Sequence, residues 1–198
     1  RKDDIINHFG KEYRGLKISY VVQTKQLGTG DAVRQCQSRL EGRFMFMNGD
    51  DLFARADIER CLAHDYAILA TRVDDPTKFA VLEVDQNHFI TNVLEKTSAP
   101  PTNLVSIGLY VLDPKIFEYK LTPSVRGEYE ITDYLLYISK KYGLRYVEIE
   151  NYWLPIGYPW DFLNVNKYIL AHDFGPTTIE SPLPADLAAL FPARLVDS

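Results

Sequence analysis

The group of residues with the clearest chemical potential is Asn48-Gly49-Asp50-Asp51, which directly follows a short apolar run. Carboxylates at the C-terminal end of a buried strand lie where open α/β sheets bind ligands. A hard carboxylate oxygen there suits Mg²⁺, which proteins commonly hold with one or two carboxylates and substrate phosphates. The alternative is a helix N-cap, because a helical pattern follows. We therefore expect Asp50 to be the metal ligand and Asp51 the helix cap.

A glycine pair, Gly28-Thr29-Gly30, stands between a β-rich run and a helical pattern. Glycine lets backbone N–H groups approach a ligand closely, and the N-terminus of the following helix favours an anion. With Asp50 about 20 residues further on, the pair is half of a dinucleotide fingerprint, but Val33 occupies the position of the third glycine. A tight turn that begins a helix is the alternative interpretation.

Glu95-Lys96 is the third candidate, at the end of a predicted strand. The glutamate could bind a sugar hydroxyl and the lysine a phosphate, although a solvated strand end is the simpler interpretation. Cys36 and Cys61 are isolated and have no metal-ligand spacing, so we expect two small hydrophobic side chains in a reducing cytoplasm. The four histidines are scattered and indicate no site.

Strand-like and helix-like segments alternate along the chain, which predicts an α/β fold. The run 44–47 is continuous and apolar, which favours a strand buried on both faces of a parallel sheet. From Phe174 onward proline and small residues dominate, so we expect a linker or poorly ordered tail over 173–198. The predicted strands are 18–22, 44–47, 66–71, 79–84, 88–94, 104–112 and 145–153, and the predicted helices are 31–40, 56–64, 131–141 and 160–171.

The composition is that of an ordinary globular protein, with 198 residues, 46% hydrophobic and 25% charged. A net charge of −5 without a run of Lys or Arg argues against broad binding to nucleic acid or to anionic membranes. No apolar stretch approaches the roughly 18 residues of a membrane helix. We therefore expect a cytoplasmic protein whose partners are small molecules, with homo-oligomerisation left open.

Six stretches of the sequence, in this order and spacing, resemble the sugar-1-phosphate nucleotidyltransferases, a family also called NDP-sugar pyrophosphorylases. Each stretch alone is ordinary, but together they cover roughly residues 1 to 172. The stretches are 23–32, 46–50, 94–96, 103–110, 127–133 and 156–161.

The resemblance implies a Rossmann-like α/β fold with a mixed, mainly parallel sheet flanked by helices. It also implies a Mg²⁺-dependent reaction in which an NTP and a sugar 1-phosphate give an NDP-sugar and pyrophosphate. By their match to the family's motifs, Gln23 and Gly28 would bind a uracil or thymine base, with Thr29 beside them. Glu95 would bind sugar hydroxyls, Lys96 would bind the sugar phosphate and Ser106 would line the sugar pocket. Asp50 would hold Mg²⁺.

The sequence also departs from the family's pattern. The opening strand and the Gly-rich loop that grips the triphosphate are not found, and the chain begins in the helix expected after them. We therefore expect the catalytic domain, residues 1–172, to be incomplete at its N-terminus and the fragment to turn over little. Pro155 stands where the family usually has a second metal-binding Asp, and Ala80 replaces a glycine of the sugar pocket. Residues 173–198 show no hexapeptide repeat.

Three functions follow from these observations. The first is a nucleotidyltransferase that uses UTP or dTTP, with Leu27-Gly28-Thr29-Gly30 modestly favouring the uridylyltransferase branch. The second is a non-catalytic, regulatory NDP-sugar-binding relative, which Pro155 motivates. The third, a nicotinamide-dependent dehydrogenase, depends on the glycine pair and Asp50 alone.

Overall fold

The computed structural model describes residues 2–172, which form two compact units. The larger unit comprises the residues up to Gly49 together with Phe53–Trp153, and the smaller one comprises Asp50–Leu52 and the residues from Leu154 onward. The predicted tail, 173–198, lies outside the described residues. None of the helices within 2–172 is long and apolar enough to cross a membrane.

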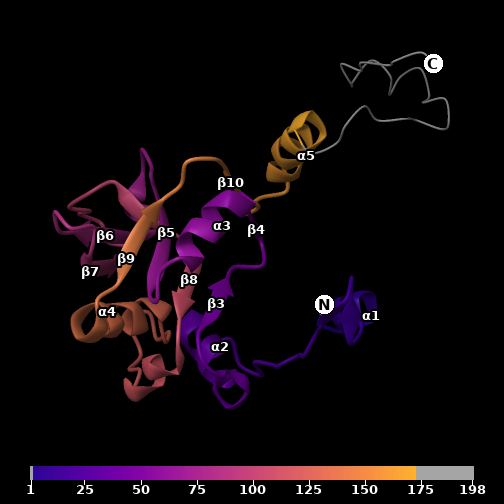
Figure 1. Cartoon of the computed structure of the whole chain (residues 1–198), viewed down its shortest axis with the longest axis horizontal. Helices are drawn as coiled ribbons and strands as arrows, with labels where there is room; N and C mark the ends of the chain where they lie inside the picture. Colours follow the sequence, from indigo (N-terminus) through magenta and orange to yellow (C-terminus); the bar gives the residue numbers. More distant parts are fainter. Residues whose placement is uncertain (1, 173–198) are drawn as a thin grey trace. The chain divides into compact units, whose positions relative to one another are not determined.

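The larger unit is built on a six-stranded sheet in the order β7-β6-β8-β5-β9, with β3 also paired to β8 (Figure 1). The central strand β8 is buried along its whole length, and its two halves pair with β6 and β3 on the same side. The strands of this sheet are β3 (Phe44–Met47), β5 (Ala67–Arg72), β6 (Ala80–Val84), β7 (Ile90–Glu95), β8 (Leu104–Leu112) and β9 (Arg145–Glu148).

Helices cover both faces of the sheet (Figure 1). Side chains of a strand alternate between faces, so Ile68 and Ala70 pack with α2 and α4, whereas Ala67 and Leu69 pack with α3 on the opposite face. Burying each large apolar side chain in these two layers contributes about 1.5–3 kcal/mol before the entropy cost of folding. The helices are α1 (Lys2–Phe9), α2 (Thr29–Gln35), α3 (Arg55–Leu62) and α4 (Ile131–Tyr142), with short 3-10 helices η1 (Gln37–Arg39), η2 (Pro76–Lys78) and η3 (Pro114–Glu118).

The α/β class with a mixed sheet is confirmed, but the expectation of a mainly parallel sheet is wrong for the strands described. Only β5 and β9 run parallel, while β3, β5 and β6 are all antiparallel to β8. The β6–β7 pair shows the reason, because a short turn joins the two strands. The carboxylate of Asp85 accepts hydrogen bonds from the N–H groups of Asn87 and Phe89 in that turn. A parallel pair would need a crossover of a dozen residues or more.

Strand β3 is present as predicted, but it is not buried on both faces. It pairs antiparallel with β8, from Phe44 opposite Leu112 to Met47 opposite Leu109. Its phenylalanines pack into the layer that contains α2 and α4, whereas Met45 and Met47 are 40% and 43% exposed. The apolar run therefore reflects one buried face and one half-exposed face rather than a strand inside a parallel sheet.

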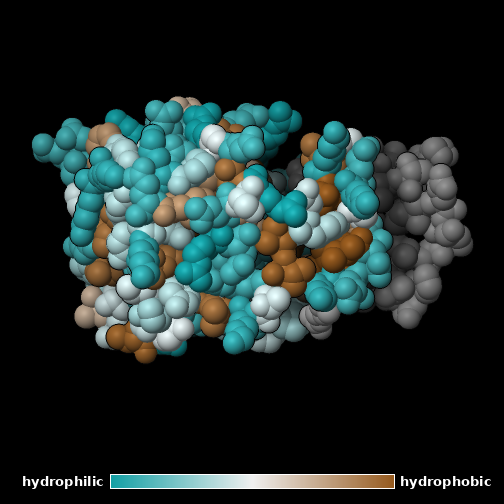
Figure 2. All heavy atoms as spheres, turned by 90° about the horizontal axis from the view of Figure 1, so that it is seen from below, coloured by the Kyte–Doolittle hydropathy of each residue, from teal (hydrophilic) through white to brown (hydrophobic). Residues whose placement is uncertain are grey.

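The predicted helices 131–141 and 160–171 are confirmed as α4 and α5 (Asp161–His172). Gly143 ends α4 with φ +80°, a conformation that glycine adopts without the steric cost of a Cβ. Hydrophilic side chains cover much of the surface shown in Figure 2, with hydrophobic side chains between them.

Other boundaries differ from the sequence patterns. The run 18–22 forms no strand, although it is rich in β-forming residues. A short hairpin comes before this run, in which β1 (Glu12–Tyr13) pairs with β2 (Leu16–Lys17). The predicted strand 145–153 divides into β9 and β10 (Trp153–Pro155).

Asp51 does not cap a helix, contrary to the expectation. It begins a strand, β4 (Asp51–Phe53), which pairs with β10 in a separate two-stranded sheet. The helix that follows, α3, has Ala54 at its N-cap. The N-cap position of α3 therefore lies at Ala54, three residues further along the chain than the sequence pattern indicated.

Candidate functional site

The Gly-rich segment Leu27–Gly30 is hydrogen-bonded to the residues that begin α4. The N–H of Tyr129 donates to the carbonyl of Leu27 at 2.7 Å, and the N–H of Gly30 donates to the carbonyl of Tyr129 at 2.8 Å. The N–H of Ile131 donates to the hydroxyl of Thr29 at 3.1 Å. Two segments that are far apart in sequence thus form one backbone-paired structure at the helix start.

Close backbone contact explains both glycines of this segment. Gly28 has φ +105°, and a Cβ there would lie 2.5 Å from the carbonyl oxygen of Tyr129. A Cβ on Gly30 would lie 2.6 Å from the carbonyl oxygen of Glu130. The tight turn that begins a helix is therefore present, and a larger residue at either position would separate the two segments.

Gln23 is held against the same turn. Its Nε2 donates to the carbonyl of Gly28 at 3.2 Å and to Oδ2 of Asp31 at 2.8 Å. Asp31 is only 1% exposed, and the hydrogen bond from Gln23 is the largest of the contacts that lower the pKa of its carboxyl. With both donors of its amide directed inward, Gln23 keeps Oε1 as an acceptor that no donor among residues 2–172 engages. That arrangement suits a ligand with an N–H donor.

Glu95 and Lys96 lie at the end of β7, beside the start of β6. Glu95 pairs with Ala80, and the N–H of Lys96 donates to the carbonyl of Phe79 at 3.0 Å. Lys96 has φ +45°, in the left-handed region that a residue with a Cβ adopts at a cost. Backbone strain of this kind is commonly found where a side chain must be aimed at a ligand.

The Glu95 carboxylate lies among other charged groups. Its Oε1 is 3.5 Å from Nη2 of Arg126 and 4.0 Å from Nζ of Lys96. Burial raises the pKa of Glu95, and the negative charge of Glu130 raises it further, while Lys96 and Arg126 act in the opposite direction. The sequence motif 127–133 lies next to Arg126, yet its spacing gave no sign that this arginine reaches Glu95.

Segment 124–131 connects the two groups of predicted residues. Through its backbone it contacts Leu27–Gly30, and through Arg126 it contacts Glu95. The structure therefore brings Gln23, Gly28, Thr29 and Glu95 into one connected framework within the larger unit.

Ser106 is the third residue of β8 and is only 5% exposed. Its hydroxyl donates to the hydroxyl of Tyr110 at 3.0 Å. Because that contact already uses the Ser106 hydroxyl as a donor, a ligand would have to bind a remaining lone pair. A place for Ser106 in a sugar pocket stays a prediction.

Asp50 belongs to the smaller unit, where its carbonyl accepts from the N–H of Ile156 at 2.9 Å and its side chain is exposed. In the same unit, Oδ2 of Asp161 accepts from the N–H groups of Gly157 and Tyr158, so this carboxylate organises its own loop. Pro155 offers no side-chain ligand. No group of three or more metal-ligating side chains occurs within residues 2–172. One exposed carboxylate fits Mg²⁺ if phosphates and water complete its coordination.

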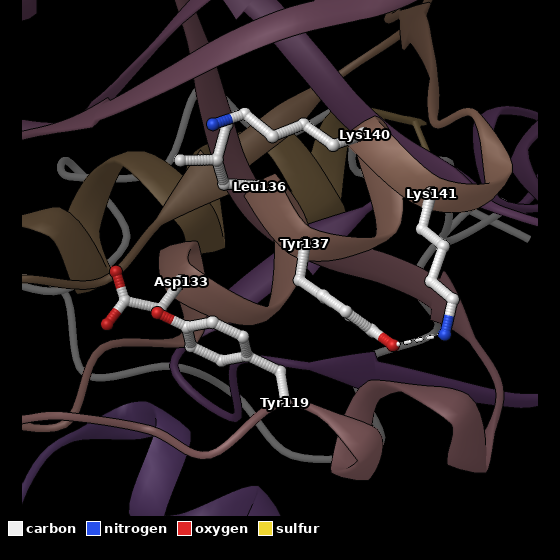
Figure 3. Close-up of a pocket in the computed structure, with 6 residues that line it drawn as sticks. All are labelled: Tyr119, Asp133, Leu136, Tyr137, Lys140 and Lys141. Carbon is white, nitrogen blue, oxygen red and sulfur yellow. Dashed lines mark hydrogen bonds between the residues drawn. The ribbon is translucent and has the colours of Figure 1, made fainter.

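Two open pockets at the surface of residues 2–172 are lined by none of these predicted residues. One, about 690 Å³, lies between α3 and β9. The other, about 340 Å³, lies on the outer side of α4 (Figure 3). It is lined by Tyr119, Asp133, Leu136, Tyr137, Lys140 and Lys141.

Contacts at the edge of the smaller pocket indicate a structural role. In Figure 3 the hydroxyl of Tyr137 points toward Nζ of Lys141, which donates to it at 2.8 Å. Both groups also bind Oε2 of Glu118, each at 2.6 Å. The Lys141 ammonium, followed by the hydroxyls of Tyr137 and Tyr142, lowers the pKa of Glu118 to about 2. These exposed side chains satisfy one another and link α4 to η3.

Known proteins with similar sequences and structures are nucleotidyltransferases. The chain is 38% identical over 177 residues to the bifunctional protein GlmU of Methanococcus vannielii, covering 85% of this chain and 42% of that protein. It is 34% identical to the UTP–glucose-1-phosphate uridylyltransferase AglF of Haloferax volcanii, covering 81% of this chain and 70% of AglF. A putative glucose-1-phosphate thymidylyltransferase from Bacillus anthracis, solved with a sucrose, is 30% identical with a TM-score of 0.73, covering 89% of this chain and 74% of that one.

The chain thus spans about two fifths of the length of its GlmU relatives and most of the length of AglF. The match to the family extends over residues 2–172, which include every element of both units described above. The backbone-paired turn at Gly28, the Glu95-Lys96 strand end and Asp50 all lie within it. The chain belongs to the nucleotidyl transferase family.

Proposed function

We propose that this protein transfers a nucleotidyl group from an NTP to a sugar 1-phosphate, releasing pyrophosphate and an NDP-sugar. The observation that carries the proposal is the connection of a base-binding turn, Gln23 with Gly28, to a strand end that carries Glu95 and Lys96, through one segment, 124–131. AglF and the Bacillus anthracis protein are both named for transfer to glucose 1-phosphate, which supports a hexose 1-phosphate as acceptor.

The base would be uracil or thymine. Oε1 of Gln23 is an acceptor without a donor from residues 2–172, and both pyrimidines present a ring N–H. The backbone of Gly28 can approach the base closely because no Cβ intervenes. Thr29 would act from beside the base, since its hydroxyl already accepts the N–H of Ile131.

The acceptor sugar would lie against the end of β7. The carboxylate of Glu95 would accept hydrogen bonds from sugar hydroxyls, Lys96 would pair with the phosphate and Ser106 would line the pocket. An oxygen of the sugar phosphate would attack the α-phosphorus of the NTP. The new P–O bond forms as the bond to the β-phosphate oxygen breaks, and pyrophosphate leaves with the electron pair. The protein would therefore act by positioning and charge neutralisation.

Mg²⁺ would be held by Asp50 together with phosphate oxygens. The cation supplies positive charge that offsets the charge of the reacting phosphates. Both cysteines are free thiols, and Cys61 is buried, which is consistent with the reducing cytoplasm that we expect for the protein.

The alternative function is an NDP-sugar-binding regulator without turnover. Pro155 favours this alternative, because a proline side chain cannot ligate a metal. Pro155 lies in β10, next to Ile156, whose N–H donates to the carbonyl of Asp50. The third interpretation, a nicotinamide-dependent dehydrogenase, is wrong, since residues 2–172 belong to the nucleotidyl transferase family.

The test is pyrophosphate release from UTP and dTTP with a panel of sugar 1-phosphates, measured on the protein with Mg²⁺ present. Release that requires both an NTP and one sugar 1-phosphate supports the enzyme. Tight binding of an NDP-sugar without turnover would favour the regulator instead, and turnover at about 1 s⁻¹ or faster would exclude it. The absence of both pyrophosphate release and NDP-sugar binding would contradict both functions.

A further inference from the structure

We propose that Arg126 is a positioning residue that orients the Glu95 carboxylate toward the sugar. The inference rests on the proposed function, in which Glu95 binds sugar hydroxyls. No sequence motif led to this arginine, and its role follows from the contacts of one guanidinium nitrogen.

Nη2 of Arg126 lies between two carboxylates. It is 2.7 Å from Oε1 of Glu130 and 3.5 Å from Oε1 of Glu95. Lys96 approaches the same oxygen of Glu95, at 4.0 Å. Both cations therefore engage Oε1, and no donor among residues 2–172 reaches Oε2 of Glu95. One oxygen is held by the protein, and the other stays available as an acceptor for a sugar hydroxyl.

Arg126 can orient Glu95 because Arg126 is itself held in place. Its stronger partner, Glu130, is only 6% exposed and also accepts from the hydroxyl of Ser124 at 3.1 Å. The N–H of Arg126 donates to the same Ser124 hydroxyl at 3.3 Å, within a turn closed by the bond from the Gly127 N–H to the Ser124 carbonyl at 2.8 Å. The guanidinium is thus fixed by a buried acid and by a short turn.

Segment 124–131 contacts both Glu95 and Leu27–Gly30, but the side chain of Arg126 makes only the contact with Glu95. The hydrogen bonds that hold Leu27–Gly30 come from the backbone of Tyr129 and Ile131, not from Arg126. A substitution that keeps a donor for Glu130, such as Arg126→Gln, should therefore disturb the sugar side and leave the base side in place. A purely structural role would disturb both sides.

The charges around Glu95 predict a second consequence. The groups that face it are Glu130, which raises the pKa of Glu95, and Lys96 and Arg126, which lower it. Without Arg126 the pKa of Glu95 rises further, so the carboxylate takes up its proton at a higher pH. Sugar recognition should then be lost at a higher pH as the solution is acidified.

The test is calorimetric titration of the 198-residue protein with UDP-glucose and with UDP, and with dTDP-glucose and dTDP as a second pair. Arg126→Gln should weaken binding of the sugar nucleotide by about tenfold and leave binding of the free diphosphate within about twofold. Arg126→Lys should fall between, because an ammonium keeps the charge without the planar fork. Arg55→Gln, which removes an exposed ion pair on α3, is the matched control and should change neither affinity.

The outcomes separate the inference from the function. An unchanged affinity ratio of sugar nucleotide to free diphosphate in Arg126→Gln would overturn the inference alone, as would equal weakening of both ligands. Failure of the unaltered protein to bind either sugar nucleotide would overturn the proposed function and the inference with it. A lower ratio in Arg126→Gln, together with loss of that ratio at a higher pH, would establish the positioning role.

Discussion

The hydroxyl of Thr29 accepts the backbone N–H of Ile131 at 3.1 Å, across 102 residues of sequence. A residue that begins α2 thereby satisfies one of the first N–H groups of α4, whose own N-cap residue, Glu130, makes no side-chain capping bond. The contact stabilises the helix start and simultaneously fixes the turn that carries Gly28. Folding and the proposed binding of the base therefore depend on the same hydrogen bond.

Replacing this hydroxyl should destabilise the protein measurably. We expect Thr29→Val, which keeps the shape but removes the acceptor, to lower the free energy of unfolding by about 1 kcal/mol. Thr29→Ser, which retains the hydroxyl, is the control and should lose less. Urea denaturation of the two variants and the parent measures the difference. Equal stability of the Val and Ser variants would show that the hydrogen bond contributes nothing.

Gly28→Ala should be far more disruptive than an alanine at another left-handed glycine. Gly28 has φ +105° and a backbone oxygen 2.5 Å from where a Cβ would lie, whereas Gly42, with φ +64°, has no atom within 4 Å. Gly42→Ala should therefore cost only the dihedral strain, about 1 kcal/mol. Gly28→Ala adds the steric clash and should also abolish nucleotide binding. Thermal unfolding and UDP titration of the pair test this, and similar losses in both variants would refute the steric argument.

Asp57 should make stability depend on pH. Burial alone would raise its pKa, but hydrogen bonds from the Glu150 N–H, Arg60 and Asn151 lower it below the usual value. Its charged form is therefore favoured in the folded state. The stabilisation is present above the unfolded pKa of about 3.9 and is lost as the pH falls through the lower, folded pKa.

Asp57→Asn should remove that part of the acid dependence and destabilise the protein at pH 7 by about 1–3 kcal/mol, since a buried charged acceptor of several donors is lost. Asp65→Asn, at an exposed carboxylate with a long 3.9 Å ion pair, is the control and should have little effect. The measurement is the free energy of unfolding from pH 7 to pH 3. A parallel acid dependence in the Asp57→Asn variant and the parent would contradict the prediction.

Asp50→Ala should abolish the low Mg²⁺-dependent pyrophosphate release expected of the parent, because it removes the carboxylate proposed to bind the metal. Asp65→Asn should retain activity in the same assay. The free energy of unfolding should change little in Asp50→Ala, since the carboxylate is exposed. Full activity in this variant would eliminate Asp50 as the metal ligand.

Pro155→Asp tests the departure at the second metal position. Residue 155 lies in β10, next to Ile156, whose N–H binds the carbonyl of Asp50. A second carboxylate there should strengthen binding of Mn²⁺, measured by electron paramagnetic resonance, by about tenfold or more. Pro155→Asn, which adds no charge, is the control. If both variants bind Mn²⁺ as the parent does, residue 155 lies outside the metal site.

Local patterns in the sequence determined much of this protein. The apolar periodicity of 131–141 with Gly143 after it predicted α4, and the continuous run 104–112 predicted β8, because such patterns depend on interactions within a few residues. The six ordered motifs likewise identified the family, which the match over 2–172 confirmed.

Tertiary structure alone decided how these elements pair and which side chains meet. Strand direction depends on connections and packing across the sheet, so the apolar run 44–47 did not reveal that β3 lies antiparallel to β8 with one half-exposed face. The contact between Arg126 and Glu95 joins residues 31 positions apart, and no periodicity encodes it. Residue types and spacing identified the candidate chemical groups. Only the packing of α4 against the sheet set the distance between Arg126 and Glu95, because contacts between distant residues follow from the fold as a whole.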